Sequence, residues 1–441
     1  MDFGGYDFRI FAEEKHFKDL YVAEEIGEII NDAVYARNKT VEERFNINIK
    51  PVFYSSDWNR MMDGEKSITA GYDDFDIMSL HGRVAYRYTE NNLIADWFTS
   101  MPYVDFDAPW WNQDIIKECS MFDKLYFASG DISYTGLGSA ICLMFNKNLF
   151  QDLNIKYPYE EVVNGTWTLD KFISAVKSGA ADLDGDGVIT PDKDRYGFDI
   201  ASVWYYPTTV LYCGGDRVVK KCEEESEPVL SLMNERTIDI FDKFFDMLKN
   251  GAACISKEKY WGNYAGTEIF RNGRALFIDG GMESIIRYRD MEDEIGIVPV
   301  PKYDEQTPKY FTIVEAYARM ITVPVTQTDF DRTSIIVEAL CVEGHKTIIP
   351  AYYEKALKTK YSYDKESAEM LDYIKDGRVF DFGYLNEMMV GNLASVGAML
   401  VREQDANFVS YYEKYEHNMK IDYEYAVEKF SGNTSCVCHG N

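Results

Sequence analysis

The amino-acid sequence predicts an α/β protein with two domains. Its 441 residues exceed the length at which a single hydrophobic core keeps growing, so two domains are expected. Strand-like runs alternate with stretches of helical periodicity, which is typical of α/β units. With 46% hydrophobic and 15% aromatic residues, the chain has enough apolar side chains to build two cores.

The N-terminal elements follow a β-α-β-α-β order. Residues 6–12 are predicted as a strand, 22–45 as a helix, 47–53 as a second strand and, after another helix, 76–80 as a third. Further strands are predicted at 143–146, 275–278, 295–300 and 317–323, and a helix is predicted to begin after Thr168, which can cap it. The C-terminal quarter is mainly helical, and no repeat of fixed period is present.

Composition excludes several classes of function. The net charge of −28 repels phosphate backbones and anionic lipids, and no basic cluster offsets it, so neither nucleic acid nor a membrane surface is an expected partner. No apolar run approaches the roughly 20 residues of a membrane span. The chain opens without a basic or apolar leader, so we expect that any export signal has been removed or never existed.

The eight cysteines are too scattered for a disulfide scaffold or for a zinc site with two CxxC pairs. Most are expected to be buried thiols. Two weaker readings stay open. Cys213 and Cys222 could close a small loop in an exported protein, and residues 436–439 could bind stray metal.

The most specific motif is a calcium-type loop that begins at Asp182. Carboxylates at alternate positions before a glycine can converge on one hard cation, and Gly187 permits the bend that follows. In this interpretation the ligands are the side chains of Asp182, Asp184 and Asp186, the carbonyl of Val188 and the side chain of Asp194.

The loop departs from the standard pattern at its twelfth position. Lys193 stands where a bidentate carboxylate is expected, so Asp194 is predicted to close the loop. The alternative is a polar turn without metal. Because no second loop with this spacing exists in the chain, we expect Ca²⁺ to be structural rather than a switch.

The order of several segments resembles the extracellular solute-binding proteins of ABC importers, in the family of maltose- and oligosaccharide-binding lipoproteins. These segments follow the family order over about four fifths of the chain. They are 76–78 with 93–96, 144–150 with 166–168, 182–198, 270–277 and 296–303. The helical end, 352–372, resembles a subgroup from Gram-positive gut bacteria.

The resemblance implies a two-lobe fold of the periplasmic-binding-protein type II class, with a hinge and a ligand cleft between the lobes. It implies an N-terminal lobe of residues 1–136 and 279–325 and a C-terminal lobe of 137–278 and 326–441. Closure of the cleft on a ligand would be recognised by the permease subunits of the importer. It also implies an extracellular, monomeric protein, held at the cell surface by a lipid anchor outside this chain.

Ligand contacts follow from the same resemblance. His81 and Arg83 lie on a loop after a strand, where the family places polar contacts, and Arg83 offers a planar fork of donors. Trp204, Tyr205 and Tyr206 match the place of a sugar-stacking aromatic ring. Topology adds Tyr134, Glu283 and Tyr317. The alternatives are an exposed loop for His81 and Arg83 and a core position for Trp204.

An enzyme is the competing class of function. HExxH, GxSxG, Walker and GxGxxG motifs are all missing from the sequence. Paired carboxylates for glycoside hydrolysis distinguish nothing among 74 acidic residues. We therefore expect a non-enzymatic carbohydrate-binding protein. The alternatives are a binding protein for a peptide or another carboxylate, and a carbohydrate-active enzyme.

Overall fold

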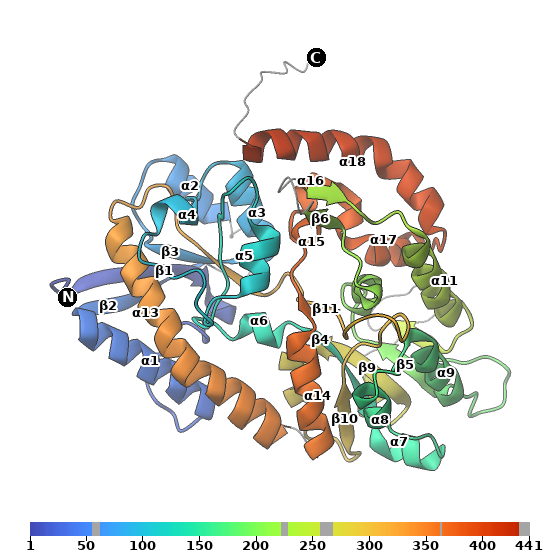
Figure 1. The fold of residues 1–441 in the computed structure, drawn as a ribbon. Helices are drawn as coiled ribbons and strands as arrows, with labels where there is room; N and C mark the ends of the chain where they lie inside the picture. Colours follow the sequence, from blue (N-terminus) through green and yellow to red (C-terminus); the bar gives the residue numbers. More distant parts are fainter. Residues whose placement is uncertain (55–61, 222–227, 256–267, 362–363, 432–441) are drawn as a thin grey trace.

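The computed structural model describes residues 1–54, 62–221, 228–255, 268–361 and 364–431. It confirms the predicted two-lobe α/β architecture, in which each lobe is built on its own sheet (Figure 1). No helix in these ranges has both the length and the apolar character that a membrane span requires.

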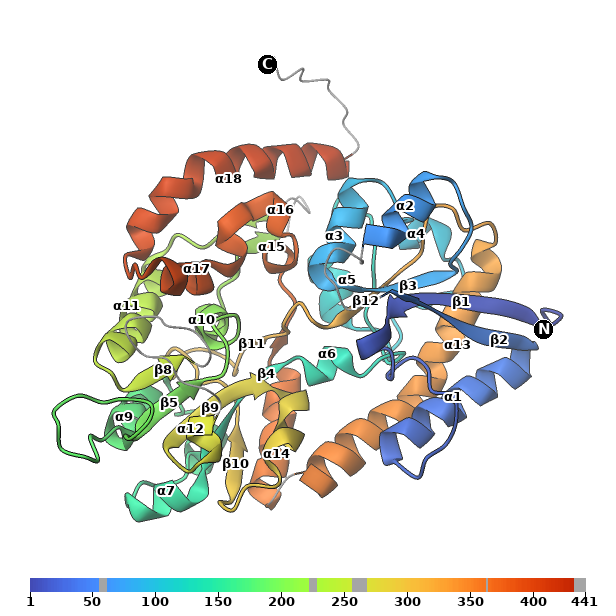
Figure 2. The ribbon, with the colours of Figure 1, turned by 180° about the vertical axis from the view of Figure 1, so that it is seen from behind.

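The N-terminal lobe contains a sheet of order β12-β3-β1-β2. Its strands are β1 (Tyr6–Glu13), β2 (Ile47–Tyr54), β3 (Ile77–His81) and β12 (Arg319–Thr322). Its helices are α1 (Ile29–Phe45), α2 (Asp63–Thr69), α3 (Gly82–Glu90), α4 (Trp97–Ser100), α5 (Gln113–Cys119) and α13 (Phe330–Ile349). Helices α1 and α13 pack together on one side of the sheet, and α2 and α3 lie on the other (Figures 1 and 2).

Helix α1 is shorter than the predicted helix over 22–45. Gly27 adopts a left-handed φ of +79°, and the Glu28 side chain then accepts hydrogen bonds from the amides of Ile30 and Asn31. This cap fixes the start of the helix at Ile29, because it satisfies amides that have no partner within the helix.

The C-terminal lobe contains a sheet of order β10-β4-β9-β5-β8. Its strands are β4 (Ile141–Asn146), β5 (Tyr196–Ile200), β8 (Ala253–Ile255), β9 (Ala275–Gly281) and β10 (Ile295–Val298). Its helices are α7 (Lys147–Asp152), α8 (Tyr159–Val163), α9 (Leu169–Gly179), α10 (Tyr206–Thr209), α11 (Glu235–Lys249), α12 (Glu268–Arg271) and α14 (Lys365–Asp376). Two small two-stranded sheets are also present. One pairs β6 (Val219–Lys221) with β7 (Pro228–Leu230), and the other pairs β11 (Thr312–Ile313) with β13 (Arg378–Val379).

The predicted boundaries of the lobes differ from the structure at two points. Residues 279–325 were expected in the N-terminal lobe, but β10 pairs antiparallel with β4 of the C-terminal lobe. Residues 326–441 were expected in the C-terminal lobe, but α13 packs against α1. Strand-like and helical patterns show that an element exists and leave its partner open, so β10 and α13 lie in the other lobe, whereas β12 and α14 lie in the lobes predicted for them.

Three segments connect the lobes in the described part of the chain. The first runs from Ala128, which bridges Ile321 in the N-terminal lobe, through α6 (Thr135–Gly138) to β4. The second runs from β11 to β12, and Val314 within it bridges Ala140 of the first. The third follows α13 through the π-helical segment η5 (Pro350–Tyr361) to α14.

The C-terminal helices lie beside both lobes. They are α15 (Phe382–Leu385), α16 (Glu387–Val390), the 3-10 helix η6 (Gly391–Ser395), α17 (Val396–Glu403) and α18 (Phe408–Ser431). Helix α18 lies across the two lobes (Figures 1 and 2). Its Phe408 ring lies 5.1 Å from Phe241 in the C-terminal lobe, and its Phe430 ring lies 6.3 Å from Tyr86 in the N-terminal lobe.

The described cysteines do not form disulfides. Cys119, Cys142, Cys213, Cys254 and Cys341 are free and buried, as expected for most of the thiols. Cys222 lies outside the described residues, as do residues 436–439, so the possible loop and the possible metal-binding end stay predictions.

Candidate functional site between the lobes

A cavity of about 160 Å³ lies between the lobes, at the first and second connecting segments. Its walls come from η1 (Glu14–His16) and β12 of the N-terminal lobe, from η4 (Met282–Tyr288) of the C-terminal lobe and from the connecting residues beside α6. The lining residues are Lys15, His16, Lys18, Asp19, Tyr134, Thr135, Ser139, Glu283, Tyr317 and Arg319. The structure therefore brings together three of the predicted ligand contacts, Tyr134, Glu283 and Tyr317.

Tyr317 is the centre of an aromatic and imidazole cluster in this cavity. Its hydroxyl lies 2.9 Å from His16 Nε2, and its ring meets the rings of His16 and His81 edge-on at 4.8 Å and 5.7 Å. Tyr317 remains 40% exposed, whereas His81 is buried. Burial, with Arg319 and Arg83 nearby, lowers the pKa of His81 well below its usual value, so His81 is neutral at pH 7.

Arg319 and Asp19, two of the residues that line the cavity, each have a buried side-chain atom without a hydrogen-bond partner in the described structure. Arg319 donates from Nη2 to Glu13 at 2.7 Å, but its Nη1 has no partner in the described structure. Asp19 accepts a hydrogen bond from the Ser133 hydroxyl, but its Oδ1 has none. Buried polar atoms are almost always paired, so this donor and this acceptor are suited to polar groups of a ligand.

Glu283 lines the cavity, and the carboxyl group of Glu315 lies near it. Burial raises the pKa of Glu283, and nearby Glu315 adds to the increase. Glu315 accepts hydrogen bonds from the Tyr317 amide at 2.6 Å and the Tyr384 hydroxyl at 3.1 Å, and burial raises its pKa as well. Burial, with Glu315 and Glu283 nearby, raises the pKa of Tyr205 to about 12, but Tyr205 is not among the residues that line the cavity.

Arg83 connects the N-terminal lobe to the C-terminal helices in this structure. From helix α3 it donates through Nη1 to Glu387 at 3.2 Å and through Nη2 to the Ser395 hydroxyl. Its guanidinium also lies 5.0 Å from the centre of the Tyr384 ring. The donor fork that was predicted to hold a ligand is therefore engaged by residues of the C-terminal helices.

The three aromatic residues of the 204–206 segment point to different places. Tyr206 is fully buried, with the rings of Phe198 and Phe172 at 4.8 Å and 5.5 Å, so the structure does not support its predicted contact with a ligand. Trp204 is half-buried, and the Arg402 guanidinium lies 5.1 Å from its ring. A sugar that stacked on that face of Trp204 would compete with Arg402.

Asp279 on β9 fixes the backbone of this aromatic segment. Its carboxyl accepts hydrogen bonds from the Ala201 amide at 2.6 Å and from the Tyr206 amide at 2.9 Å. Burial raises the pKa of Asp279 to about 7. The backbone before and after Tyr205 is thus held by an acidic side chain in the core.

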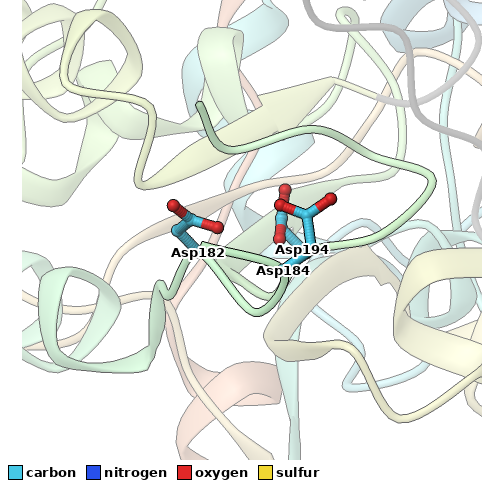
Figure 3. Close-up of side chains that lie close together, drawn as sticks. All are labelled: Asp182, Asp184 and Asp194. Carbon is cyan, nitrogen blue, oxygen red and sulfur yellow. The ribbon is translucent and has the colours of Figure 1, made fainter. Parts of the chain in front are cut away.

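The calcium-type loop brings together three of its predicted carboxylate ligands. One oxygen each from Asp182, Asp184 and Asp194 lies within 4.8 Å of the others, and Figure 3 shows these side chains side by side. Asp194 is buried and accepts from the amides of Leu183 and Thr190, each at 2.7 Å. These amide hydrogen bonds lower the pKa of Asp194, which therefore stays ionised.

The remaining predicted ligands are arranged differently. Asp186 is outside this carboxylate group and accepts a hydrogen bond from the amide of Val188 at 2.8 Å, an Asx-turn interaction. The Lys193 amine lies 2.7 Å from Asp184, and this contact lowers the pKa of Asp184. The loop thus combines a convergent acidic cluster with a lysine that occupies one of its carboxylates.

Sequence reasoning missed His16, Asp19, Glu315 and Arg319. A general rule could have found the first two, since residues that follow the carboxyl end of a parallel strand meet at the ligand edge of an α/β sheet. His16 and Asp19 come directly after β1. Arg319 lies inside a strand pattern and Glu315 just before it, where the sequence carries no comparable signal.

No protein-family model matches the chain, and no curated protein sequence matches it. Many solved structures match. A substrate-binding protein of an ABC transporter from Listeria monocytogenes, solved with cycloalternan, is 14% identical, with a TM-score of 0.58 over 97% of this chain and 99% of that one.

Two further structures agree over similar lengths. UgpB from Mycobacterium tuberculosis, solved with glycerophosphocholine, is 12% identical, with a TM-score of 0.62 over 96% of this chain and 99% of that one. A sugar transporter protein from Rhizobium etli, in an open conformation, is 14% identical, with a TM-score of 0.60 over 97% and 98%. The chain therefore has the two-lobe fold of the solute-binding proteins of ABC transporters.

Proposed function

We propose that this protein captures a neutral carbohydrate between its lobes, without altering it chemically, and delivers it to the permease of an ABC importer. The observation that carries the proposal is the inter-lobe cavity, in which buried Arg319 and Asp19 keep a donor and an acceptor without a protein partner. A sugar hydroxyl can donate to one and accept from the other.

The charges around the cavity favour a neutral ligand over an ionic one. Three basic residues, Lys15, Lys18 and Arg319, line the cavity with two acidic ones, Asp19 and Glu283, so the lining carries charges of both signs. Arg83, the donor predicted for a peptide or other carboxylate ligand, here binds Glu387 and Ser395. The structures that share this fold were solved with cycloalternan, raffinose and maltotriose, among other ligands, which supports a carbohydrate.

Location and partners belong to the same proposal. We infer an extracellular, monomeric protein that is attached to the membrane by a lipid anchor outside this chain. Support comes from the fold, whose known examples work with ABC transporters. Size-exclusion chromatography with light scattering checks the monomer, for which a mass near 50.9 kDa is expected.

A thermal-shift screen tests the function. Neutral oligosaccharides such as maltotriose and raffinose are compared with dipeptides and amino acids, and a ligand at 100 times its dissociation constant adds about 2.7 kcal/mol to stability. The best ligand is then incubated with the protein and analysed for products. We expect a sugar to bind and to be recovered unchanged. Stabilisation by peptides alone would favour the alternative ligand, and turnover of the sugar would favour an enzyme.

We also propose that the calcium-type loop holds a structural Ca²⁺ ion. Its support is the convergence of Asp182, Asp184 and Asp194, whose mutual repulsion a divalent cation would offset. The carbonyl of Val188 and the carboxylate of Asp186 would complete the ligand set. The contact between Lys193 and Asp184 argues for weak affinity, because the ion would have to displace the lysine amine.

Removal of calcium is expected to lower the melting temperature of the protein, because the cluster then loses its counter-charge. Extracellular calcium-binding modules bind with dissociation constants of about 10⁻⁴ to 10⁻³ M, so millimolar calcium should restore the melting temperature. Asp184→Ala should abolish this response, whereas Asp192→Ala, an exposed carboxylate in the same loop, should retain it. A melting curve that ignores both chelator and calcium would leave the polar turn as the correct interpretation.

A further inference from the structure

Helix α18 reaches from one lobe to the other, as Figures 1 and 2 show. Its 24 residues contain neither glycine nor proline, so the helix is continuous. At roughly 1.5 Å per residue it is about 36 Å long. It begins on α11 of the C-terminal lobe, where Phe408 packs against Phe241, and it ends on α3 of the N-terminal lobe. Because a continuous helix cannot lengthen, one of its ends must leave its lobe if the lobes move apart.

The buried side chains of α18 follow one face of the helix along its whole length. They are Phe408, Tyr411, Tyr412, Met419, Ala426 and Phe430. Their helical spacing makes a single apolar stripe, which a helix buries against its neighbours. The same face therefore packs on the C-terminal lobe at the start of the helix and on the N-terminal lobe at its end.

Three buried aromatic rings meet where α18 reaches the N-terminal lobe, and we call them the inter-lobe clasp. Phe430 of α18 and Phe382 of α15 lie 6.3 Å and 4.9 Å from Tyr86 of α3, both edge-on. The two phenylalanine rings lie 6.0 Å from each other. Separation of the lobes would return this apolar surface to water, so the clasp stabilises the contact between them.

Two lysines add polar contacts beside the clasp. Lys429 of α18 donates to the carbonyl of Glu90, the last residue of α3, at 3.2 Å. Lys124 of the N-terminal lobe donates to the Phe430 carbonyl at 3.3 Å, next to the end of α18. The last carbonyls of a helix have no partner within it and carry partial negative charge, so a lysine suits them. The C-terminal ends of α3 and α18 are thus joined by hydrogen bonds as well as by apolar contact.

We propose that the inter-lobe clasp holds the two lobes in the arrangement seen here, and that the lobes open only when the Phe430 end of α18 leaves Tyr86. Once the clasp is released, self-repulsion in a chain of net charge −28 favours separated lobes. The strength of the clasp then sets how often the cavity between the lobes opens. This inference holds whichever ligand that cavity takes.

Small-angle X-ray scattering of the full chain without added ligand tests the proposal. The wild-type radius of gyration should match that of the structure, and the double variant Phe382→Ala/Phe430→Ala should have a larger one. Hydrogen exchange should rise at least about tenfold at the end of α18 and around Lys124, because the rings no longer hold the two together. Ile421→Ala is the matched control, since Ile421 is an exposed apolar residue of the same helix.

Each outcome decides the proposal. If the folded double variant keeps the wild-type radius of gyration, the proposal is overturned, even where exchange rises, because the helix end then unwinds while the lobes stay together. A wild-type protein that is already more extended than the structure also overturns it. Phe382 follows the Asp381 cap of α15, so its replacement could disturb folding, which circular dichroism reports. In that case Phe430→Ala decides alone, because Phe430 lies next to the end of its helix.

Discussion

Replacing Asp381 with alanine is expected to lower the free energy of unfolding by about 3 kcal/mol or more, because the substitution strands several buried donors at once. The Asp381 carboxylate is almost fully buried. Its donors are the Tyr212 hydroxyl at 3.0 Å and the amides of Val218 at 2.6 Å, Val219 at 3.4 Å, Gly383 at 2.8 Å and Tyr384 at 3.3 Å.

The effect should extend to ligand binding. Asp381 caps α15, and that helix carries Tyr384, whose hydroxyl donates to Glu315, the carboxyl group near Glu283 of the cavity lining. Loss of the cap should therefore let Tyr384 and Glu315 shift. Urea denaturation followed by tryptophan fluorescence measures the stability, and sugar titration of the folded variant measures the affinity.

Asp405→Ala is the matched control. This carboxylate is exposed and accepts a hydrogen bond from the Asn407 amide at 2.9 Å, close to the start of α18. An exposed turn hydrogen bond of this kind contributes about 0.5 to 1.5 kcal/mol. If Asp381→Ala lowers the free energy of unfolding no more than the control does, water replaces the carboxylate. The hydrogen bonds to Asp381 then do not contribute the expected stability.

The alternation of strand and helix patterns predicted the fold class, because period-2 and period-3.6 patterns reflect local burial. The same patterns could not place β10 or α13, since both lobes bury apolar faces in the same way. The loop at Asp182 was found because calcium loops have short, local spacing. Its Lys193 contact required the folded geometry.

The inter-lobe site also shows that a single sequence does not predict contacts between residues far apart in the chain. Tyr134, Glu283 and Tyr317 were placed by topology, and they do line one cavity. Arg319 was missed, because an arginine in a strand looks like an ordinary solvent-facing residue until its partner is known. That partner is Glu13, which lies 306 residues away in the sequence. Pairs at such separation carry no signal in a single sequence.

Variants of the Arg319–Glu13 ion pair can distinguish an effect on stability from an effect on ligand binding. Arg319→Met should leave Glu13 buried without its cation, which typically costs about 3 to 5 kcal/mol. Adding Glu13→Gln removes the stranded charge, so the double variant should recover most of the lost stability. Glu13→Gln alone should retain most of the sugar affinity, because Arg319 keeps its unpartnered Nη1.

Sugar affinity should follow a different order from stability. A hydrogen bond from a charged donor contributes about 1.5 to 3 kcal/mol, so both variants that lack Arg319 should bind the best sugar of the screen roughly 10- to 100-fold more weakly. Urea denaturation gives the stabilities, and calorimetry on the folded proteins gives the affinities. If the double variant is stable and binds as tightly as the wild type, Arg319 only holds Glu13, and the donor that supports the proposed function is not used. If it is stable and binds weakly, Arg319 contributes separately to the fold and to the ligand, because its two terminal nitrogens have different partners.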